Sequence, residues 1–247
     1  MPKAQIVCMK WGDKYPAHYV NVLYAMARRH IQGDLRFVCL TDDASDVRPE
    51  VECLPCPDIA IPAPFNNTGW RKITLWTESL PDMTGDWLFL DLDVVVTGPL
   101  DDFFTFKPEA SFVVMHNFTQ PGTGIGNTSV YRFRVGSHPY LLERTLKEPL
   151  VLVKQYRNEQ TFVSRCIKEI EYWPEAWCLL FKVHCVPPMP LRWWRPPALP
   201  ETARVVAFPG EPNPDQAIAG LWPAKKSYKK IYKHILPTDW VAEHWRE

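Results

Sequence analysis

Apolar residues in the first part of the chain fall into runs that short polar stretches separate. Residues 4–9 form one apolar run, and residues 19–30 carry apolar side chains at helical spacing. A second apolar run, at 35–40, stops at the polar residues 41–43. This order of strand, helix and strand predicts the opening of an α/β sheet.

The rest of the chain continues this alternation. The pattern predicts strands at 51–55, 86–90, 111–116, 128–133, 179–186 and 203–208, and helices at 69–80, 138–147 and 158–170. The sequence shows no internal repeat and no flexible linker. A single α/β domain that covers residues 1–247 is therefore expected, with at most a topological boundary near Gly98.

Composition places the chain among soluble globular proteins. The 247 residues are 46% apolar and 23% charged, and the formal net charge is zero. No overall field therefore attracts nucleic acid, and we expect no nucleic-acid partner. No apolar run approaches the ~20 residues of a membrane span, and the N-terminal residues do not read as a leader, so a cytoplasmic location is expected.

Cysteine, proline and tryptophan add smaller indications. The seven cysteines form an odd, scattered set, which favours reduced thiols over a disulfide framework. Cys53 and Cys56 form a lone C-x-x-C pair, without a second pair at the spacing of a zinc site. Prolines gather around two adjacent tryptophans in residues 185–201, which predicts a long, ordered surface loop.

An acidic pair, Asp91 and Asp93, directly follows the apolar run at 86–90. In open α/β sheets ligands bind beyond the carboxyl ends of strands, where two carboxylates one residue apart can reach the same ion. Mn²⁺ and Mg²⁺ prefer such oxygen ligands and bridge to phosphates. Two other interpretations stay open: the pair caps a turn, or it carries the nucleophile of a haloacid dehalogenase-type phosphatase.

The order of several short motifs resembles a known class of enzymes. The motifs are 6–15 (IVCMKWGDKY), 37–43 (FVCLTDD), 70–76 (WRKITLW), 88–104 (LFLDLDVVVTGPLDDFF), 124–133 (GIGNTSVYRF), 158–163 (NEQTFV) and 208–214 (FPGEPNP). In this order they resemble a glycosyltransferase of the GT-A fold, and the chain is most similar to bacterial sugar transferases related to family eight. The resemblance implies a Rossmann-like mixed sheet flanked by helices.

The resemblance also implies a division of the domain and a reaction. Residues 1–97 would form the nucleotide-binding half, 98–220 the acceptor-side half, and 221–247 a basic and aromatic C-terminal segment. The implied reaction moves a hexose from a nucleotide diphosphate sugar, a UDP-sugar, to a glycan or glycolipid acceptor in polysaccharide biosynthesis. Mn²⁺ or Mg²⁺ is the implied cofactor, and retention of the anomeric configuration is expected.

Site residues follow from the positions that match the family. The implied nucleotide-sugar-binding residues are Lys10, Trp11, Gly12, Asp13, Tyr15, Thr41, Asp42, Arg71, Lys72, Asp91, Leu92 and Gly210. Asp91 and Asp93 are the implied metal ligands, and the implied catalytic residues are Asn127, Glu159 and Gln160. Asn127 would bond the transferred sugar, and Gln160, or else Glu159, would steady its developing positive charge. Taken alone, each of these residues also has a structural interpretation, as cover for the sheet, a turn cap or an exposed helix face.

One segment departs from the family pattern. The family completes its metal site with a His near the C-terminus, whereas this chain has Ala207, Phe208 and Pro209 in that segment, and Asn213 replaces the usual Lys. A water, the nucleotide or the distant His184 would have to complete the coordination. A degenerate transferase fold that binds nucleotide or glycan without catalysis is therefore the main alternative.

The C-terminal segment predicts an amphipathic basic helix within 221–236. Its apolar stripe is Tyr228, Ile231, Tyr232, Ile235 and Leu236, and its basic face is Lys226, Lys229, Lys230 and Lys233. A helix of this type binds the surface of an anionic membrane, which would place the enzyme on the inner face of the membrane. The alternative is that the stripe packs on the domain while the lysines face water.

Overall fold

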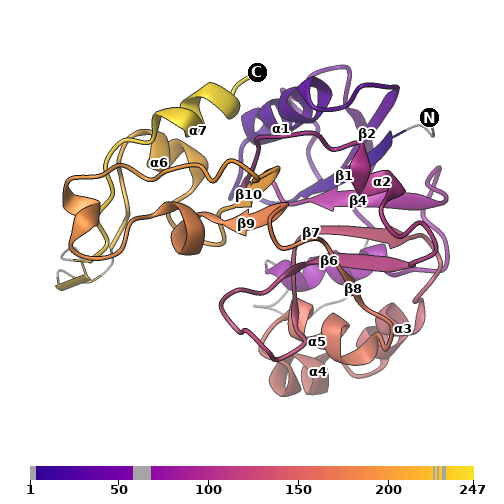
Figure 1. The fold of residues 1–247 in the computed structure, drawn as a ribbon. Coiled ribbons are helices and arrows are strands. Elements are labelled where there is room, and N and C mark those ends of the chain that lie inside the picture. Colours follow the sequence, from indigo (N-terminus) through magenta and orange to yellow (C-terminus); the bar gives the residue numbers. More distant parts are fainter. Residues whose placement is uncertain (1–3, 58–67, 225, 227, 230–231) are drawn as a thin grey trace.

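The computed structural model describes residues 4–57, 68–224, 226, 228–229 and 232–247. Within them, a large mixed sheet forms the centre of the molecule, in the order β3-β2-β1-β4-β7-β6-β8 (Figure 1). Its strands are β3 (Glu52–Pro55), β2 (Leu35–Thr41), β1 (Ala4–Lys10), β4 (Asp86–Leu90), β7 (Gly126–Arg134), β6 (Phe112–His116) and β8 (Glu171–Tyr172). The first four are parallel, whereas β7 runs antiparallel to both β4 and β6.

A smaller sheet lies against the large one, in the order β5-β10-β9. Its strands are β5 (Val94–Val96), β10 (Val205–Ala207) and β9 (Cys178–Leu180). Because β4 ends at Leu90 and β5 begins at Val94, the chain passes from the large sheet to the small one through residues 91–93. The acidic pair therefore occupies the crossing between the two sheets.

Both faces of the large sheet are buried. Along β1, Ile6 and Cys8 face one core, and Val7 and Met9 face the other, because successive side chains of a strand alternate. The first core lies under α1 (Ala17–Arg29) and the small sheet. The second lies under the 3-10 helix η2 (Gly69–Leu75), α3 (Tyr140–Lys147), α4 (Pro149–Gln155) and α5 (Glu159–Cys166). Burial on both sides explains the continuous apolar runs of the sequence.

The structure confirms most of the predicted elements and changes two of them. The segment predicted as a helix at 69–80 is a 3-10 helix that ends at Leu75. Its buried Trp70 and Ile73, followed by Trp76, are spaced three residues apart, which is the period of a 3-10 helix. The strand predicted at 179–186 ends at Leu180, and a π-helical turn follows it. A short apolar run alone does not separate a strand from a helical turn.

Short helices were harder to predict. Those without a counterpart in the predicted set are α2 (Asp102–Thr105), α4, η4 (Leu191–Trp193), α6 (Pro214–Ile218) and α7 (Asp239–His244). In α6 the helix begins at Pro214, and the side chain of Gln216 accepts a hydrogen bond from the Asn213 backbone N–H. Capping residues and a proline at the first position allow such a short helix to begin even without an amphipathic pattern.

The helix predicted within 221–236 is wrong for the part of that range that the structure describes, which contains no α-helix. Lys230 and Ile231 lie outside the described residues. Of the predicted stripe, Ile235 is buried in the first core, whereas Tyr228 and Tyr232 are exposed, so these residues do not share one face of a helix. Figure 1 shows the late segments projecting as a lobe to the left of the large sheet.

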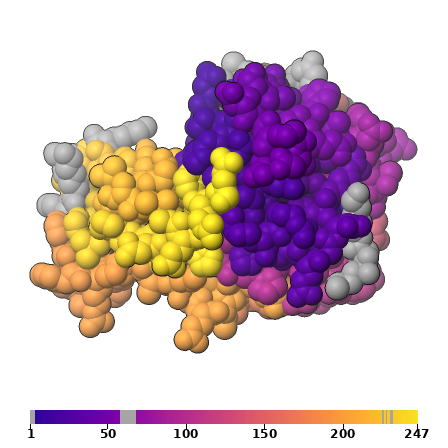
Figure 2. All heavy atoms as spheres, turned by 90° about the horizontal axis from the view of Figure 1, so that it is seen from above, coloured from indigo at the N-terminus to yellow at the C-terminus, as the bar shows by residue number. Residues whose placement is uncertain are grey.

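The C-terminus returns to the N-terminal part of the molecule. Figure 2 shows the yellow C-terminal residues against the indigo segment that contains α1. The guanidinium of Arg29 donates hydrogen bonds to the carbonyls of His244 (2.6 Å) and Arg246 (2.9 Å). Trp245 meets the rings of His18 and Tyr19 edge to face. No helix within the described ranges has the length and apolar character needed to cross a membrane.

One glycine contact controls the start of β7, the strand that lines the site described below. A Cβ added to Gly126 would lie 2.5 Å from a methyl carbon of Val114 on β6, at the point where the register of the two strands shifts. Real Cβ atoms do not approach so closely, so this position requires glycine for the strands to pair as they do.

We expect Gly126→Ala to lower the free energy of unfolding by about 1–3 kcal/mol, the usual cost of overpacking a well-packed core. Urea denaturation measures the loss. In a Val114→Ala background the added methyl has room, so the same substitution should cost less there. Equal losses in both backgrounds would show that the contact is not the cause.

Candidate active site

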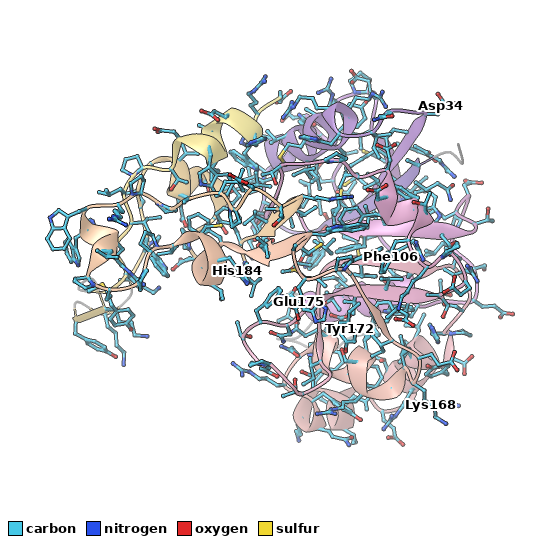
Figure 3. The ribbon with its side chains drawn as sticks, in the orientation of Figure 1. Asp34, Phe106, Lys168, Tyr172, Glu175 and His184 are labelled. Atoms are coloured by element: carbon cyan, nitrogen blue, oxygen red, sulfur yellow. The ribbon has the colours of Figure 1, made fainter. Side chains whose placement is uncertain are left out.

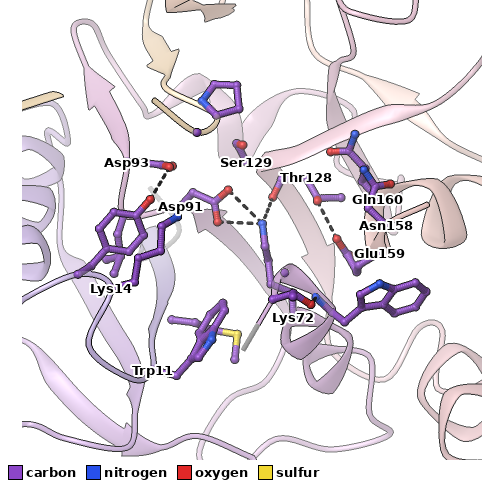
Figure 4. Close-up of a pocket in the computed structure, with 18 of the residues that line it drawn as sticks. Trp11, Lys14, Lys72, Asp91, Asp93, Thr128, Ser129, Asn158, Glu159 and Gln160 are labelled. Carbon is purple, nitrogen blue, oxygen red and sulfur yellow. Dashed lines mark hydrogen bonds and ion pairs between the residues drawn. The ribbon is translucent and has the colours of Figure 1, made fainter. Parts of the chain in front are cut away.

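A cavity of about 700 Å³ opens where β1 and β4 end and β7 begins. Most of the residues that the sequence singled out line it. They are Trp11, Gly12, Asp13, Tyr15, Lys72, Asp91, Leu92, Asp93, Asn127, Glu159, Gln160 and Gly210. These residues come from distant parts of the sequence, and the sheet brings them to one edge (Figure 4).

Backbone hydrogen bonds fix the crossing segment at both ends. The N–H of Asp91 donates to the carbonyl of Ser129 on β7 (2.9 Å), and the N–H of Phe208, after β10, donates to the carbonyl of Asp93 (3.0 Å). Leu92 between them is 3% exposed and packs in the first core. The two carboxylates therefore lie at the cavity while the intervening side chain anchors the segment. Leu92 contributes mainly this anchor to the predicted binding set.

Lys72 is fully engaged with the acidic pair. Its ammonium lies 2.8 and 3.0 Å from the two carboxylate oxygens of Asp91, and it also donates to the carbonyl of Thr128 (2.9 Å). Burial by itself lowers the pKa of a lysine, but the nearby carboxylates, chiefly those of Asp91 and Glu159, outweigh burial and raise it. Lys72 therefore stays charged and partly neutralises the acidic cluster.

Asp93 is the more deeply buried member of the pair, with 7% of the residue exposed. Its Oδ2 accepts a hydrogen bond from the hydroxyl of Tyr15 (2.7 Å). Burial, and then the charge of Asp91, raise the pKa of Asp93 to about 6. Burial together with Asp93 also raises the pKa of Tyr15, so this tyrosine remains a donor. The hydroxyl of Tyr15, which the sequence suggested would meet the nucleotide, thus bonds an acidic residue.

Glu159 and Gln160 lie on the opposite wall, in the first turn of α5 rather than in the middle of a helix. The helix begins there because the side chain of Asn158 accepts the backbone N–H of Thr161 (3.1 Å). Glu159 is 3% exposed, and one of its oxygens accepts from the hydroxyl of Thr128 (2.8 Å). Its other oxygen, Oε1, is buried without a hydrogen-bond partner among the residues that the structure describes. Burial raises the pKa of Glu159 to about 7.

Asn127 caps a local turn and also lines the cavity. Its side-chain oxygen accepts the backbone N–H of Ser129 (2.9 Å), which is a local cap, and the residue also lines the cavity. The carboxamide is therefore held in one orientation before any ligand binds.

Four predicted residues do not line this cavity. Lys10 and Asp42 line an adjoining depression of about 520 Å³. There, the Asp42 carboxylate accepts a hydrogen bond from the backbone N–H of Gly12 (3.0 Å). Thr41 is buried and bonds to the backbone of Asp43. Arg71 lines neither cavity, and its Nε is buried without a partner. This geometry supports neither interpretation of Arg71, as a solvated residue on a helix face or as a ligand of the diphosphate.

Other lining residues were missed by sequence reasoning. They include Met9, Lys14, Thr68, Gly69, Trp70, Thr128, Ser129, Arg157, Asn158 and Pro209. Most of them sit beside a predicted residue within the same motif, so a sequence signal was present. Only the fold shows which neighbours point inward.

The donor set for a metal ion consists of Asp91 and Asp93. No group of three or more His, Cys, Asp or Glu side chains comes together anywhere in the described ranges. His184, labelled in Figure 3, does not line the cavity: its ring packs edge-on against Phe118, and its Nδ1 accepts the backbone N–H of Leu180. The side chain of Phe208 stacks on Phe181 in the core. Carboxylates fit Mn²⁺ or Mg²⁺ by type, but this chain offers two of them, and each already accepts a hydrogen bond.

Comparison with known proteins supports the fold. No family model and no curated protein sequence matches the chain. Among solved structures, the galactosyltransferase LgtC, in a complex with donor and acceptor sugar analogues, aligns with a TM-score of 0.62 and 16% identity over 97% of this chain and 99% of its own. The apo bifunctional glycosyltransferase WbbM aligns with a TM-score of 0.59 and 12% identity, over 98% of this chain and 51% of WbbM.

A third similar structure is the glycosyltransferase GlyE from Streptococcus pneumoniae TIGR4, with a TM-score of 0.55 and 15% identity over 86% of this chain and 56% of GlyE. These likenesses show that the chain has the GT-A fold, as the motifs predicted. At such low identity these likenesses concern the fold alone.

The raised pKa of Glu159 predicts a pH-dependent stability. In the unfolded chain this carboxyl loses its proton near its usual pKa of about 4.5, whereas the folded protein holds the proton up to about pH 7. The native state therefore binds more protons in this interval, and its stability falls as pH rises from about 4.5 through 7. In Glu159→Gln this loss is absent.

We expect the unfolding free energy of Glu159→Gln, relative to wild type, to be larger at pH 8 than at pH 4.5 by an amount of the order of 3 kcal/mol. Denaturant unfolding of both proteins at a series of pH values measures the difference. A difference that does not change with pH would mean that Glu159 is ionised in the native state throughout this range.

Proposed function

We propose that this protein is a glycosyltransferase that moves a hexose from a nucleotide diphosphate sugar, a UDP-sugar, to a glycan or glycolipid acceptor. The observation that carries the proposal is the arrangement of one cavity in a GT-A fold. The acidic pair Asp91 and Asp93 lies on one wall, and the acid–amide pair Glu159 and Gln160 lies on the other. This separates a diphosphate end from a sugar end.

The donor would lie along the row of lining residues. Trp11, Gly12 and Asp13 follow β1 and offer an aromatic face, backbone and a carboxylate to a nucleoside. Asn127 and Gln160 offer amide groups to sugar hydroxyls. The residue Glu159, whose Oε1 is buried and unpartnered, offers either a proton or an acceptor to a hydroxyl. A buried polar atom of this kind gains a hydrogen bond when ligand arrives.

In the transfer, the bond between the anomeric carbon and the diphosphate oxygen breaks while a bond from the acceptor oxygen forms. The electron pair leaves with the diphosphate, and the acceptor hydroxyl gives its proton to an oxygen of the departing diphosphate. We propose that attack comes from the face that the diphosphate leaves, so the anomeric configuration is retained. The side chain of Gln160 stabilises the positive charge that develops on the sugar.

We propose that Asp91 and Asp93 hold Mn²⁺ or Mg²⁺. A divalent cation there supplies positive charge to the departing diphosphate. The two carboxylates are held in place by Lys72 and Tyr15, whose hydrogen bonds fix their orientation before the cation arrives. Deprotonation of Asp93, with its raised pKa, accompanies cation binding, so binding strengthens with pH.

A second candidate function is nucleotide or glycan binding without catalysis. The specific observation in its favour is the return segment after β10, where Ala207 belongs to the strand and Phe208 faces the core. Neither side chain supplies a metal ligand. Turnover of nucleotide sugar separates the two candidates, because a degenerate fold would bind the same nucleotide and release no sugar.

We expect Asp93→Asn to abolish metal-stimulated release of nucleoside diphosphate from the nucleotide sugar while the circular dichroism spectrum and thermal transition stay close to wild type. The neutral amide keeps a hydrogen-bond acceptor for Tyr15 and removes one anionic ligand. A panel of nucleotide sugars with Mn²⁺ identifies the donor for the assay. Undiminished turnover by this variant would refute the assignment of the acidic pair.

We also propose that the projecting lobe contacts anionic lipid at the acceptor. In the lobe, Trp193 stacks on His234 (4.1 Å between ring centroids), and Arg192 donates to the carbonyl of Tyr232 (2.7 Å). These contacts join the proline-rich loop to the basic C-terminal segment. Trp194 is 71% exposed and Tyr228 is 56% exposed. Exposed aromatic rings beside lysines are typical of proteins that bind membrane surfaces.

We expect the protein to sediment with vesicles that contain anionic lipid more than with neutral vesicles, and the double variant Trp194→Ala/Tyr228→Ala to lose most of this binding. The matched control is Leu150→Ala/Val151→Ala, since both leucine and valine there are 54% exposed on α4, outside the lobe. Equal recovery of wild type and the lobe variant with both vesicles would contradict the lipid contact.

A further inference from the structure

The proposed donor carries a diphosphate, which requires positive charge or N–H donors in the cavity. Lys72 is the obvious candidate, but its ammonium has three N–H donors, and the two oxygens of Asp91 and the carbonyl of Thr128 account for three contacts. Lys72 cannot also bond a phosphate oxygen unless one of these contacts breaks. It therefore neutralises Asp91 and leaves the diphosphate without a lysine partner from this position.

The other basic residue of the same motif does not serve either. Arg71 does not line the cavity, and its Nε is buried without a hydrogen-bond partner among the described residues. Among the described residues that line the cavity, two cationic side chains make no hydrogen bond or ion pair within the described structure: Lys14 and Arg157. These two are the free cations of the site.

The positions of these two cations differ. Arg157 directly precedes Asn158 and the acid–amide pair, so it lies at the sugar wall. Lys14 lies in the loop after β1, directly beyond Trp11, Gly12 and Asp13, and its ammonium is 4.4 Å from the ring centroid of Tyr15. The hydroxyl of Tyr15 in turn bonds Asp93. In Figure 4 the Lys14 side chain points from this loop toward the acidic pair.

This position matches the chemistry of a nucleotide sugar. In a nucleotide sugar, the diphosphate lies between the nucleoside and the sugar. The side chain of Lys14 likewise extends from the loop proposed for the nucleoside toward the acidic wall. Lys14 lines the same cavity as Asp91 and Asp93, and its side chain is exposed.

On the proposed function, we infer that Lys14 is the diphosphate-binding cation of this site. It donates hydrogen bonds directly to diphosphate oxygens. It also adds positive charge to the charge of a metal ion that only two protein carboxylates would hold. On donor binding, the exposed ammonium would exchange its contact with the Tyr15 ring for one with the phosphate. Lys14 is a binding residue for the leaving group, distinct from Lys72, which positions Asp91.

The test measures nucleotide binding by calorimetry, in EDTA and separately with Mn²⁺, so that it does not depend on turnover. The probes are the nucleoside, its monophosphate and its diphosphate, in the uridine series and, for comparison, the guanosine series. The variants are Lys14→Gln and the charge-preserving Lys14→Arg. Two controls are Arg157→Gln, which removes the other free cation of the cavity, and Lys168→Gln, an exposed lysine at the lower edge of the molecule in Figure 3.

We expect Lys14→Gln to weaken binding of the diphosphate in EDTA by about 10- to 100-fold, the usual effect of losing a charge-assisted hydrogen bond. Nucleoside binding should change less than about twofold, and Lys14→Arg should recover most of the loss. The Arg157 and Lys168 variants should bind the free diphosphate as wild type does. Raised salt should weaken diphosphate binding by wild type more than by Lys14→Gln.

Two results would overturn the inference, and they are distinguishable from failure of the proposed function. If wild type and Lys14→Gln bound the diphosphate with equal affinity, Lys14 would make no contact with the phosphates. An equal loss for nucleoside and diphosphate would show that Lys14 acts through the nucleoside loop. If wild type bound no nucleoside diphosphate in any series, with or without Mn²⁺, the proposed function itself would fail, and the inference with it.

Discussion

The crossing of the chain from the large sheet to the small one is the constraint on which the site depends. Residues 91–93 are held by β7 on one side, through the carbonyl of Ser129, and by the segment after β10 on the other, through the N–H of Phe208. With Leu92 anchored in the core, the two neighbouring carboxylates have little freedom to turn away from the cavity. The two carboxylates lie close together in a partly buried place. They therefore concentrate negative charge there, and the rest of the site must balance it.

The surrounding residues balance this charge in three different ways. Lys72 neutralises Asp91 directly, Tyr15 donates a neutral hydrogen bond to Asp93, and Glu159 holds its proton to about pH 7. These three residues come from separate segments, η2, the loop after β1 and α5, so the balance is a property of the fold and not of a single motif.

The sequence predicted the sheet well because both faces of its central strands are buried and their apolar runs are correspondingly continuous. It also predicted the residues at the ends of β1 and β4, and the acid–amide pair, because motif order carries over with the GT-A fold. It was less informative where position depends on tertiary contacts. Whether Arg71 or Lys72 enters the cavity depends on the 3-10 geometry of η2, and the inward direction of Lys14 depends on the loop after β1. The C-terminal lysine pattern predicted a helix, but burial of Ile235 in the core outweighed the helical spacing.

The bond between the N–H of Phe208 and the carbonyl of Asp93 joins residues that are far apart in the chain. During synthesis on the ribosome, the first half of the protein emerges with the acidic pair but without the strand that holds it. Until the segment after β10 has been synthesised, the backbone of Asp93 therefore lacks this hydrogen bond, whereas β7, which is synthesised earlier, already supplies the partner of Asp91.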